Sequence, residues 1–418
     1  MKNHIAKKPV TILLLSYLVM ALSATQAATD YEFPVVLKAP NILSADVVTG
    51  PNHTVLPSVW NDGYLNQYSV TSSFGKFDVT STAKLHIRIN ELNAIAAMNK
   101  VKGKDEFATS MKAAGKGVAS GVKSLVTSPV KTISGTVSGV GKLFSRAGES
   151  IFGGSRSKTE DSRFKDIIGF ASSKREIAYQ YGVDVYSDNK VLQSQLDDLA
   201  WANYGGGMSV AAMTSAVGGG AGKALTVTGG TRILNEVIRE KPAAELRILN
   251  REKLKKMNVN DDVADLFIGN TTYSPSMQTY LVAAMEQMKA TSNKALFVKF
   301  AINTPSDDVA LFRQRQAQMY AGFDKRIKPI TRFVAIGNNV AARTEQGDLI
   351  FIVPVDYLIW TENVSYIVDS ATNNLDDVKN IKSKQIWIEG AYSEKSRKAL
   401  LARGWIVKDA TDTKALFN

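Results

Sequence analysis

The beginning of the chain limits what the rest of it can fold into. Three lysines within the first eight residues precede an apolar run from Val10 to Ala24, and the small-residue stretch Ala24–Ala28 follows. This order is typical of a cleavable secretory signal. The apolar run has about 15 residues, fewer than the roughly 20 of a bilayer-spanning helix. We therefore expect residues 1–27 to be a signal peptide that is removed and takes no part in the working fold.

The remaining chain is expected to be a soluble or peripheral protein of a bacterial-type cell envelope. No later run reaches spanning length without a charge or a cluster of glycines. The predicted localisation is therefore outside the cytoplasm, in the periplasm or on an envelope membrane. Secretion into the medium is an alternative. About 390 residues and 44% hydrophobic side chains provide material for two or three domains.

Cysteine and histidine exclude several kinds of chemistry. The chain has no cysteine, so it has no disulfides, no thiolate zinc site and no cysteine nucleophile. Of three histidines, His4 belongs to the signal, which leaves His53 and His86. His86 falls among polar positions of an alternating stretch and His53 in a turn-rich one, so we expect both to be solvated. No catalytic, cofactor-binding or metal-binding residue is predicted.

Most of the positive charge lies in one segment. The formal charge is +12, and removal of the signal leaves +9. Residues 99–160 contain eleven Lys or Arg against four Asp or Glu, a local charge of +7. The aromatic residues of this segment are Phe107, Phe144 and Phe152, too few to interleave its lysines as stacking platforms for single-stranded nucleic acid. We therefore expect no nucleic-acid partner.

The N-terminal part, residues 28–101, is predicted to combine strands and a helix. Gln67 to Thr71 and Lys76 to Thr80 flank a Ser-Phe-Gly turn and predict a hairpin. Residues 85–98 alternate at first and then take helical spacing, which predicts a strand running into a helix. Residues 102–160 form a basic, Gly-rich amphipathic segment that ends in a flexible linker. A domain boundary near residue 160 follows.

The fold class predicted for the whole chain is α+β. Residues 161–327 are expected to form a helical domain, with Ser187–Asn189 and Ser306 as N-caps of two of its helices. Residues 328–418 are expected to form a small α/β module. It begins with a β-meander and continues as a strand, helix and strand over residues 385–407.

Residues 118–151 carry an apolar stripe with a period of about 3.67 residues, which is an eleven-residue repeat. At this period the basic side chains fall on the opposite face, so the segment has the character of an interfacial helix. It resembles the eleven-residue amphipathic repeats of synucleins and lipid-droplet coat proteins. The residues predicted to bind a membrane or partner are Lys116, Val118, Val122, Lys123, Val126, Lys131, Ile133, Val137, Val140, Lys142, Phe144 and Arg146.

Proline and glycine set how this segment folds. Pro129 fits the first position of a second helix, which predicts two helices instead of one. Seven glycines between positions 115 and 148 disfavour helix by about 7 kcal/mol relative to alanine. The segment is therefore expected to fold only against a surface. An anionic membrane, an envelope partner protein and the chain's own domains are the three alternatives.

Two further patterns fail as ligand motifs. The glycines of residues 218–224 lack the spacing and the Ser or Thr of a phosphate-binding loop, and Asp184 to Asn189 lack the glycine and distal glutamate of a calcium loop. The predicted function is a non-catalytic envelope protein attached through residues 105–151. One alternative is an exported hydrolase that uses carboxylates such as Asp184 or Asp356. The other is a structural subunit of an envelope complex, which predicts an exposed apolar patch.

Overall fold

The computed structural model describes residues 31–114, 158–214, 228–337, 339–375 and 380–417. It is an α+β protein, as predicted. Its elements in chain order are β1 (Val36–Lys38), α1 (Ala39–Ile42), α2 (Ala45–Val48), β2 (Thr49–Gly50), β3 (His53–Val55), β4 (Ser58–Asn61), β5 (Asn66–Ser72), β6 (Gly75–Thr80), α3 (Thr82–Lys102), α4 (Asp105–Ala113), α7 (Lys158–Gln180), α8 (Lys190–Tyr204), α9 (Val210–Thr214), α10 (Thr228–Glu240), α11 (Ala243–Lys256), α12 (Asp261–Ile268), α13 (Pro275–Gln287), α14 (Lys294–Ile302), α15 (Asp307–Arg326), β7 (Ile330–Ile336), β8 (Asn339–Thr344), β9 (Asp348–Val353), β10 (Tyr357–Leu358), α16 (Glu362–Asn373), β11 (Ser383–Ile388), β12 (Ala391–Tyr392), α17 (Glu394–Ala402), β13 (Trp405–Lys408) and α18 (Ala410–Phe417).

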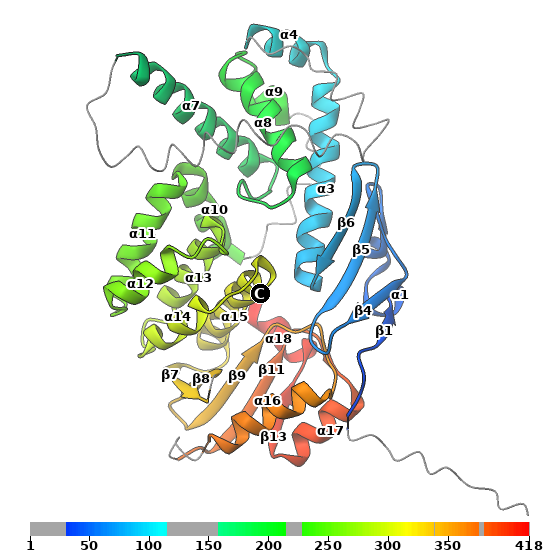
Figure 1. Ribbon diagram of the computed structural model, residues 1–418, viewed down its shortest axis with the longest axis vertical. Coiled ribbons are helices and arrows are strands. Elements are labelled where there is room, and N and C mark those ends of the chain that lie inside the picture. Colours follow the sequence, from blue (N-terminus) through cyan, green and yellow to red (C-terminus); the bar gives the residue numbers. More distant parts are fainter. Residues whose placement is uncertain (1–30, 115–157, 215–227, 338, 376–379, 418) are drawn as a thin grey trace, which may run out of the picture.

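The N-terminal strands form an antiparallel sheet that α3 covers (Figure 1). The predicted hairpin is confirmed, because β5 and β6 pair in register from Gln67 opposite Thr80 to Ser72 opposite Gly75. Tyr68, Val70 and Val79 are buried on one face of this hairpin in the same core cluster as the α3 residues Leu85 and Leu92. The opposite face carries alternating polar side chains, as expected for a sheet with one solvated side.

The prediction of a strand at the start of residues 85–98 is wrong. The whole segment belongs to α3, whose first turn is capped by the Ser81 side chain accepting a hydrogen bond from the Lys84 N–H. The polar side chains of Lys84 and Arg88 are buried in ion pairs. Polar residues therefore occupy buried positions on this helix. The sequence alternates between polar and apolar residues here because some of the buried positions are charged.

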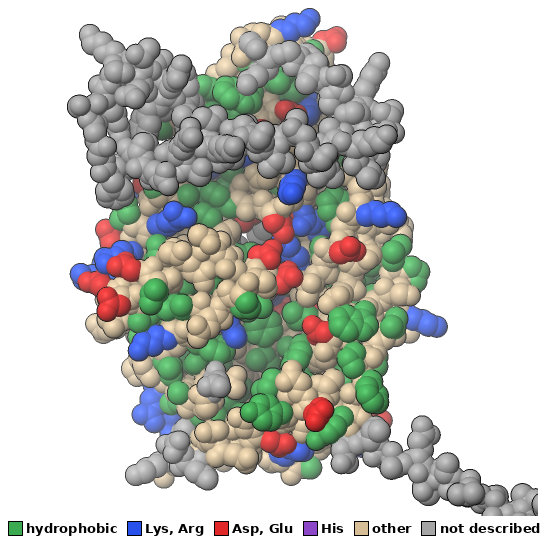
Figure 2. Space-filling view, viewed as in Figure 1, with side chains coloured by type: hydrophobic (Ala, Val, Ile, Leu, Met, Phe, Trp, Pro, Cys, Tyr) green, Lys and Arg blue, Asp and Glu red, His purple; other side chains and the backbone are tan. Residues whose placement is uncertain are grey.

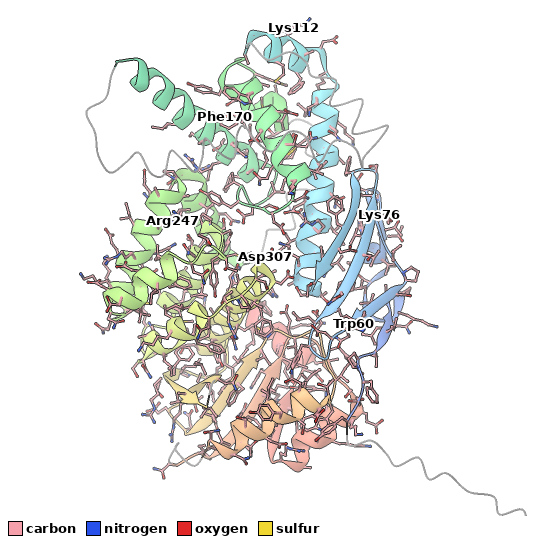
Figure 3. The ribbon with its side chains drawn as sticks, in the orientation of Figure 1. Trp60, Lys76, Lys112, Phe170, Arg247 and Asp307 are labelled. Carbon is pink, nitrogen blue, oxygen red and sulfur yellow. The ribbon has the colours of Figure 1, made fainter. Side chains whose placement is uncertain are left out.

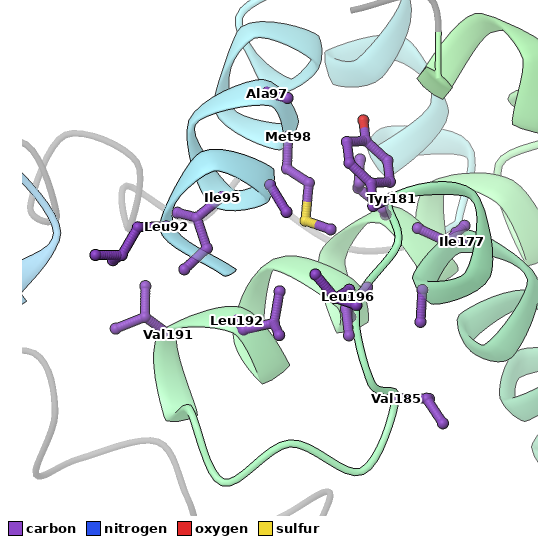
Figure 4. Packing of buried hydrophobic residues seen from close by; sticks show 14 of the residues in the cluster. Leu92, Ile95, Ala97, Met98, Ile177, Tyr181, Val185, Val191, Leu192 and Leu196 are labelled. Carbon is purple, nitrogen blue, oxygen red and sulfur yellow. The ribbon is translucent and has the colours of Figure 1, made fainter. Parts of the chain in front are cut away.

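Helix α8 packs against both α3 and α7. Leu92, Ile95 and Met98 of α3 face Leu192 and Leu196 of α8 (Figure 4). The predicted N-cap of α8 is confirmed, since the Asn189 side chain accepts hydrogen bonds from two backbone N–H groups of the first turn. This core cluster joins residues of the N-terminal sheet to residues as late as Leu246.

The C-terminal sheet lies between two layers of helices. Its strand order is β13-β11-β9-β8-β7, with antiparallel pairs among β7, β8 and β9 and parallel pairs among β9, β11 and β13. The predicted meander and the strand-helix-strand unit are therefore confirmed. Strand β9 reads as a continuous apolar run because it is buried on both faces. Ile350 and Ile352 pack towards α14, α15 and α18, and Leu349 and Phe351 pack towards α16 and α17.

Backbone hydrogen bonds join the N-terminal sheet to the C-terminal module. The Tyr64 carbonyl accepts from the N–H groups of Asp356 and Tyr357, and the Gly63 carbonyl accepts from Ile359. Glu32 pairs with Trp360 through both its backbone and its side chain. The last described helix, α18, ends near the centre of the molecule, between the sheet and the helices (Figure 1).

Candidate functional site: a central cleft

A cleft of about 3660 Å³ lies at the centre of the molecule and is lined by the N-terminal sheet and α3, by the helices and by the C-terminal module. Figure 2 shows acidic and basic side chains gathered around the hollow at the centre of one face. Asp307, at the start of α15, lies at this hollow (Figure 3). The lining contains nine Lys or Arg side chains and ten Asp or Glu side chains. The charges that line the cleft therefore nearly balance, and most of its surface is apolar, which does not fit a polyanionic ligand.

One wall of the cleft is an ion-pair network between α3 and the loop before α8. The Asp188 carboxylate lies 2.9 Å from both Lys84 Nζ and Arg88 Nη2. Arg88 Nη1 also lies 2.9 Å from Glu91, whose side chain is 2% exposed. Ser187 and Asn189 donate hydrogen bonds to the Glu91 carboxylate. Burial raises the pKa of Glu91, although Arg88 opposes the shift. This loop is thus fixed to α3 by charge.

Asp184, one of the two acids of the hydrolase hypothesis, lines the cleft but is held by its neighbours. Its Oδ1 accepts hydrogen bonds from the Tyr186 N–H at 2.9 Å and the Ser276 hydroxyl at 2.7 Å. Burial raises its pKa, and these hydrogen bonds partly oppose the shift. Ser276 lies on α13, so Asp184 connects the loop after α7 to the helical body.

Asp356, the other candidate acid, lies where the N-terminal and C-terminal parts meet. Its carboxylate accepts hydrogen bonds from the backbone N–H groups of Asn66 at 2.9 Å and Thr82 at 3.0 Å. Burial raises its pKa to about 6. Glu389 adds to this shift and forms a two-point ion pair with Arg315 of α15. Two carboxyl groups in different environments therefore adjoin each other at the cleft.

Both histidines that follow the predicted signal line this cleft. His86 is exposed on α3, in agreement with the prediction that it is solvated. The cleft walls still remove part of the water around this ring. This desolvation lowers the pKa of His86, and the positive charge of Arg315 lowers it further. The same prediction for His53 is wrong, because this side chain is only 5% exposed. It lies over Gly50, and its Nε2 lies 2.9 Å from the Val47 carbonyl oxygen, so the turn folds back onto its own ring.

The predicted membrane- or partner-binding residues, from Lys116 to Arg146, lie outside the described residues. The beginning of the longer segment is described as α4. Its apolar side chains Phe107 and Met111 are buried in the first core cluster, whereas Lys112 is exposed. Residues 105–113 thus already use their apolar face within the protein.

The part of the chain that the structure describes has neither a metal-binding cluster nor a membrane-spanning helix. No group of three or more His, Asp or Glu side chains there is placed to hold a metal ion. None of the described helices has the length and hydropathy needed to cross a membrane.

Two apolar side chains are exposed side by side on the N-terminal sheet. Val36 and Trp60 lie directly opposite each other in the β1–β4 pair and are 66% and 43% exposed.

The sequence identified the candidate acids but not the cleft. Asp356 is separated from Asn66 and Thr82 by 290 and 274 positions, so no local pattern indicates that they meet. The sequence feature that pointed to the cleft was the scarcity of histidine, because both histidines after the predicted signal line it. Compared with known proteins, the chain matches no family model, no curated protein and no solved structure.

Proposed function

We propose that this protein is a non-catalytic, exported envelope protein that binds an extended ligand without net charge in its central cleft. The observation that carries the proposal is the size and composition of the cleft. Its volume of about 3660 Å³ exceeds the roughly 300–1,000 Å³ of a small-molecule site. All three parts of the chain contribute to its lining, and the acidic and basic groups almost balance. A segment of a neutral polymer fits this description better than a compact charged metabolite.

Hydrogen–deuterium exchange on the mature protein tests this proposal. We expect soluble glycan fragments from digested cell-wall peptidoglycan, or an unfolded polypeptide offered separately, to slow exchange in residues 82–93, 182–189 and 272–280. These segments line the cleft. Residues 394–402 of α17, which are not part of the lining, provide the control. Unchanged exchange in all three cleft segments with both probes would remove the basis of the proposal.

We further propose that residues 105–151 attach the protein peripherally to an anionic envelope membrane, with Lys116 to Arg146 as the contact. The support is the eleven-residue period and the local charge of +7. Because α4 already packs on the body, the membrane-facing part of the segment begins after it. An envelope protein partner and packing on the chain itself are the competing outcomes of the test.

Flotation with vesicles containing anionic lipid at low salt tests the attachment. The variant carries glutamine at Lys116, Lys123, Lys131 and Lys142 and is expected to lose flotation, since each lysine near the surface contributes about 1 kcal/mol. The matched control carries glutamine at four exposed lysines elsewhere: Lys76, Lys100, Lys255 and Lys398. Equal flotation of both variants, or no flotation of the unaltered protein, would reject the membrane contact.

A carboxylate-dependent hydrolase is the second candidate function, because Asp356 has a raised pKa beside the Arg315-paired Glu389. Both oxygens of Asp356 accept backbone hydrogen bonds, which favours the non-catalytic binding role over the hydrolase. If the hydrolase is correct, Glu389→Gln abolishes release of soluble products from peptidoglycan, whereas Glu362→Gln, on the exposed start of α16, does not. No release between pH 5 and 8 by the unaltered protein excludes this activity on that substrate.

A further inference from the structure

Two arginines that line the cleft have no carboxylate partner among the described residues. They are Arg175 of α7 and Arg247 of α11, and neither forms an ion pair with a described residue. Four other basic residues of the lining are neutralised by described carboxylates: Lys84, Lys174, Arg239 and Arg315. The charges of Arg175 and Arg247 are therefore available to a ligand.

Arg175 combines burial with donors that a ligand can reach. The residue is 9% exposed, and its Nε donates a hydrogen bond of 3.0 Å to the Arg239 carbonyl oxygen, which fixes the guanidinium. Its two Nη atoms donate to no described group, and neither is completely enclosed by the protein. Because Arg175 lines the cleft, a ligand there can reach these atoms. Burial of the unpaired charge lowers the pKa of Arg175, and a bound anion would offset the cost of that burial.

Arg247 and the Tyr186 hydroxyl complete a group of donors from three elements, which we call the cationic subsite. Arg247 is exposed on α11 (Figure 3), and Tyr186 lies in the loop between α7 and α8. Burial raises the pKa of Tyr186 to about 12, and the positive charges of Arg175 and Arg247 both oppose the shift. The hydroxyl therefore keeps its proton at neutral pH, and it has no hydrogen-bond partner among the described residues.

We propose that the cleft binds a peptide and that the cationic subsite holds its C-terminal carboxylate; this inference rests on the proposed function of the cleft. A guanidinium group binds a carboxylate through two parallel hydrogen bonds, and the Tyr186 hydroxyl adds a third donor. The nearly balanced charge of the lining favours a ligand without net charge. A peptide meets both conditions, because its ammonium group cancels its carboxylate. The mostly apolar surface of the cleft suits the peptide's side chains.

Equilibrium dialysis of the mature chain against two pentapeptide pools tests the inference. Both pools contain random sequences of alanine, valine, leucine, serine and asparagine. One pool has a free C-terminal carboxylate, and the other is amidated there. We expect the unaltered protein to bind the free-carboxylate pool at least tenfold more tightly than the amidated pool.

Two variants assign that preference to the subsite. Arg175→Gln and Arg247→Gln should each reduce it at least tenfold. The exposed position of Arg247 makes its replacement safe for the fold, so this variant decides the test if Arg175→Gln does not fold. Arg251→Gln is the matched control, because Arg251 lies on the same helix, pairs with Asp265 and is absent from the cleft lining. It should keep the full preference.

Each other outcome overturns the inference. Equal binding of the two pools means that no carboxylate is recognised, and an Arg247→Gln variant with the full preference places the recognition elsewhere. Binding of inorganic phosphate by a protein that retains neither pool gives the subsite to a phosphate ligand. If neither pool binds while glycan fragments still protect the cleft segments from exchange, the proposed function stands and only the peptide assignment fails.

Discussion

Asp356 shows how one buried residue ties the stability of this protein to pH. Its folded-state pKa of about 6 lies above its ordinary value of 3.8, so the folded protein binds this proton more tightly than the unfolded chain. The contribution of this group is therefore complete below about pH 4 and is lost as the pH rises through about 6. Relative to Asp356→Asn, the unaltered protein should lose about 2 kcal/mol of unfolding free energy between pH 4.5 and 7.5.

Chemical denaturation of both proteins at the two pH values measures this difference. Asp369→Asn is the control, since hydrogen bonds from Arg403 hold the pKa of Asp369 below its ordinary value of 3.8. Its favourable contribution is lost only as the pH falls below that value, so the effect of Asp369→Asn on the free energy of unfolding should be the same at pH 4.5 and 7.5. If Asp356→Asn changes the free energy of unfolding by the same amount at pH 4.5 and 7.5, the raised pKa of Asp356 is contradicted.

At the scale of elements, α18 depends on a glycine of α15. A Cβ atom at Gly322 would lie 2.1 Å from the Leu416 carbonyl oxygen, which also accepts a hydrogen bond from Arg326 at 2.7 Å. We expect Gly322→Val to separate the two helices, because the clash is with backbone that cannot rotate away. The free energy of unfolding should fall by about 1–3 kcal/mol or more.

Hydrogen exchange of residues 410–417 provides the measurement for this variant, and it should become faster throughout α18. Gly103→Ala is the matched control. A Cβ at Gly103 would approach no atom outside its chain neighbours closer than 3.7 Å, and its φ of −76° suits any residue. Continued protection of α18 in Gly322→Val would show that α15 can yield at this contact.

At the scale of the whole molecule, Glu32 joins the N-terminal part of the chain to the C-terminal module. Its carboxylate accepts hydrogen bonds from the Trp360 N–H at 2.7 Å and from the Ser393 hydroxyl. We expect Glu32→Ala to release residues 31–35, which precede β1, from the C-terminal module, because two buried donors lose their acceptor. Hydrogen exchange should rise in residues 31–35 and around Trp360, while α3 and α8 stay protected by their own core.

Glu362→Ala provides the comparison at this junction, because Glu362 is an exposed carboxylate two residues after Trp360. It should leave the exchange of residues 31–35 unchanged. If Glu32→Ala behaves in the same way, the other hydrogen bonds across the junction, among them those of Tyr64, Gly63 and Asp356, hold it without the Glu32 carboxylate.

Elements whose causes are local could be predicted from the sequence. The β5–β6 hairpin follows from its turn and alternation, and α8 and α15 begin at the side chains that cap them, Asn189 and Ser306. The apolar run of β9 and the strand-helix-strand unit were also readable from pattern. The secretory signal and the amphipathic segment from Lys116 to Arg146 stay predictions, because both lie outside the described residues.

The contacts between residues far apart in the chain depend on how the elements pack together. Helix α3 hides its charged side chains in ion pairs with the loop before α8. The meeting of Asp356 with Asn66 and Thr82 arises from docking of two separate sheets. Hydrophobic periodicity records which face of an element is buried but not which element covers it. The central cleft is therefore a property of the assembled molecule.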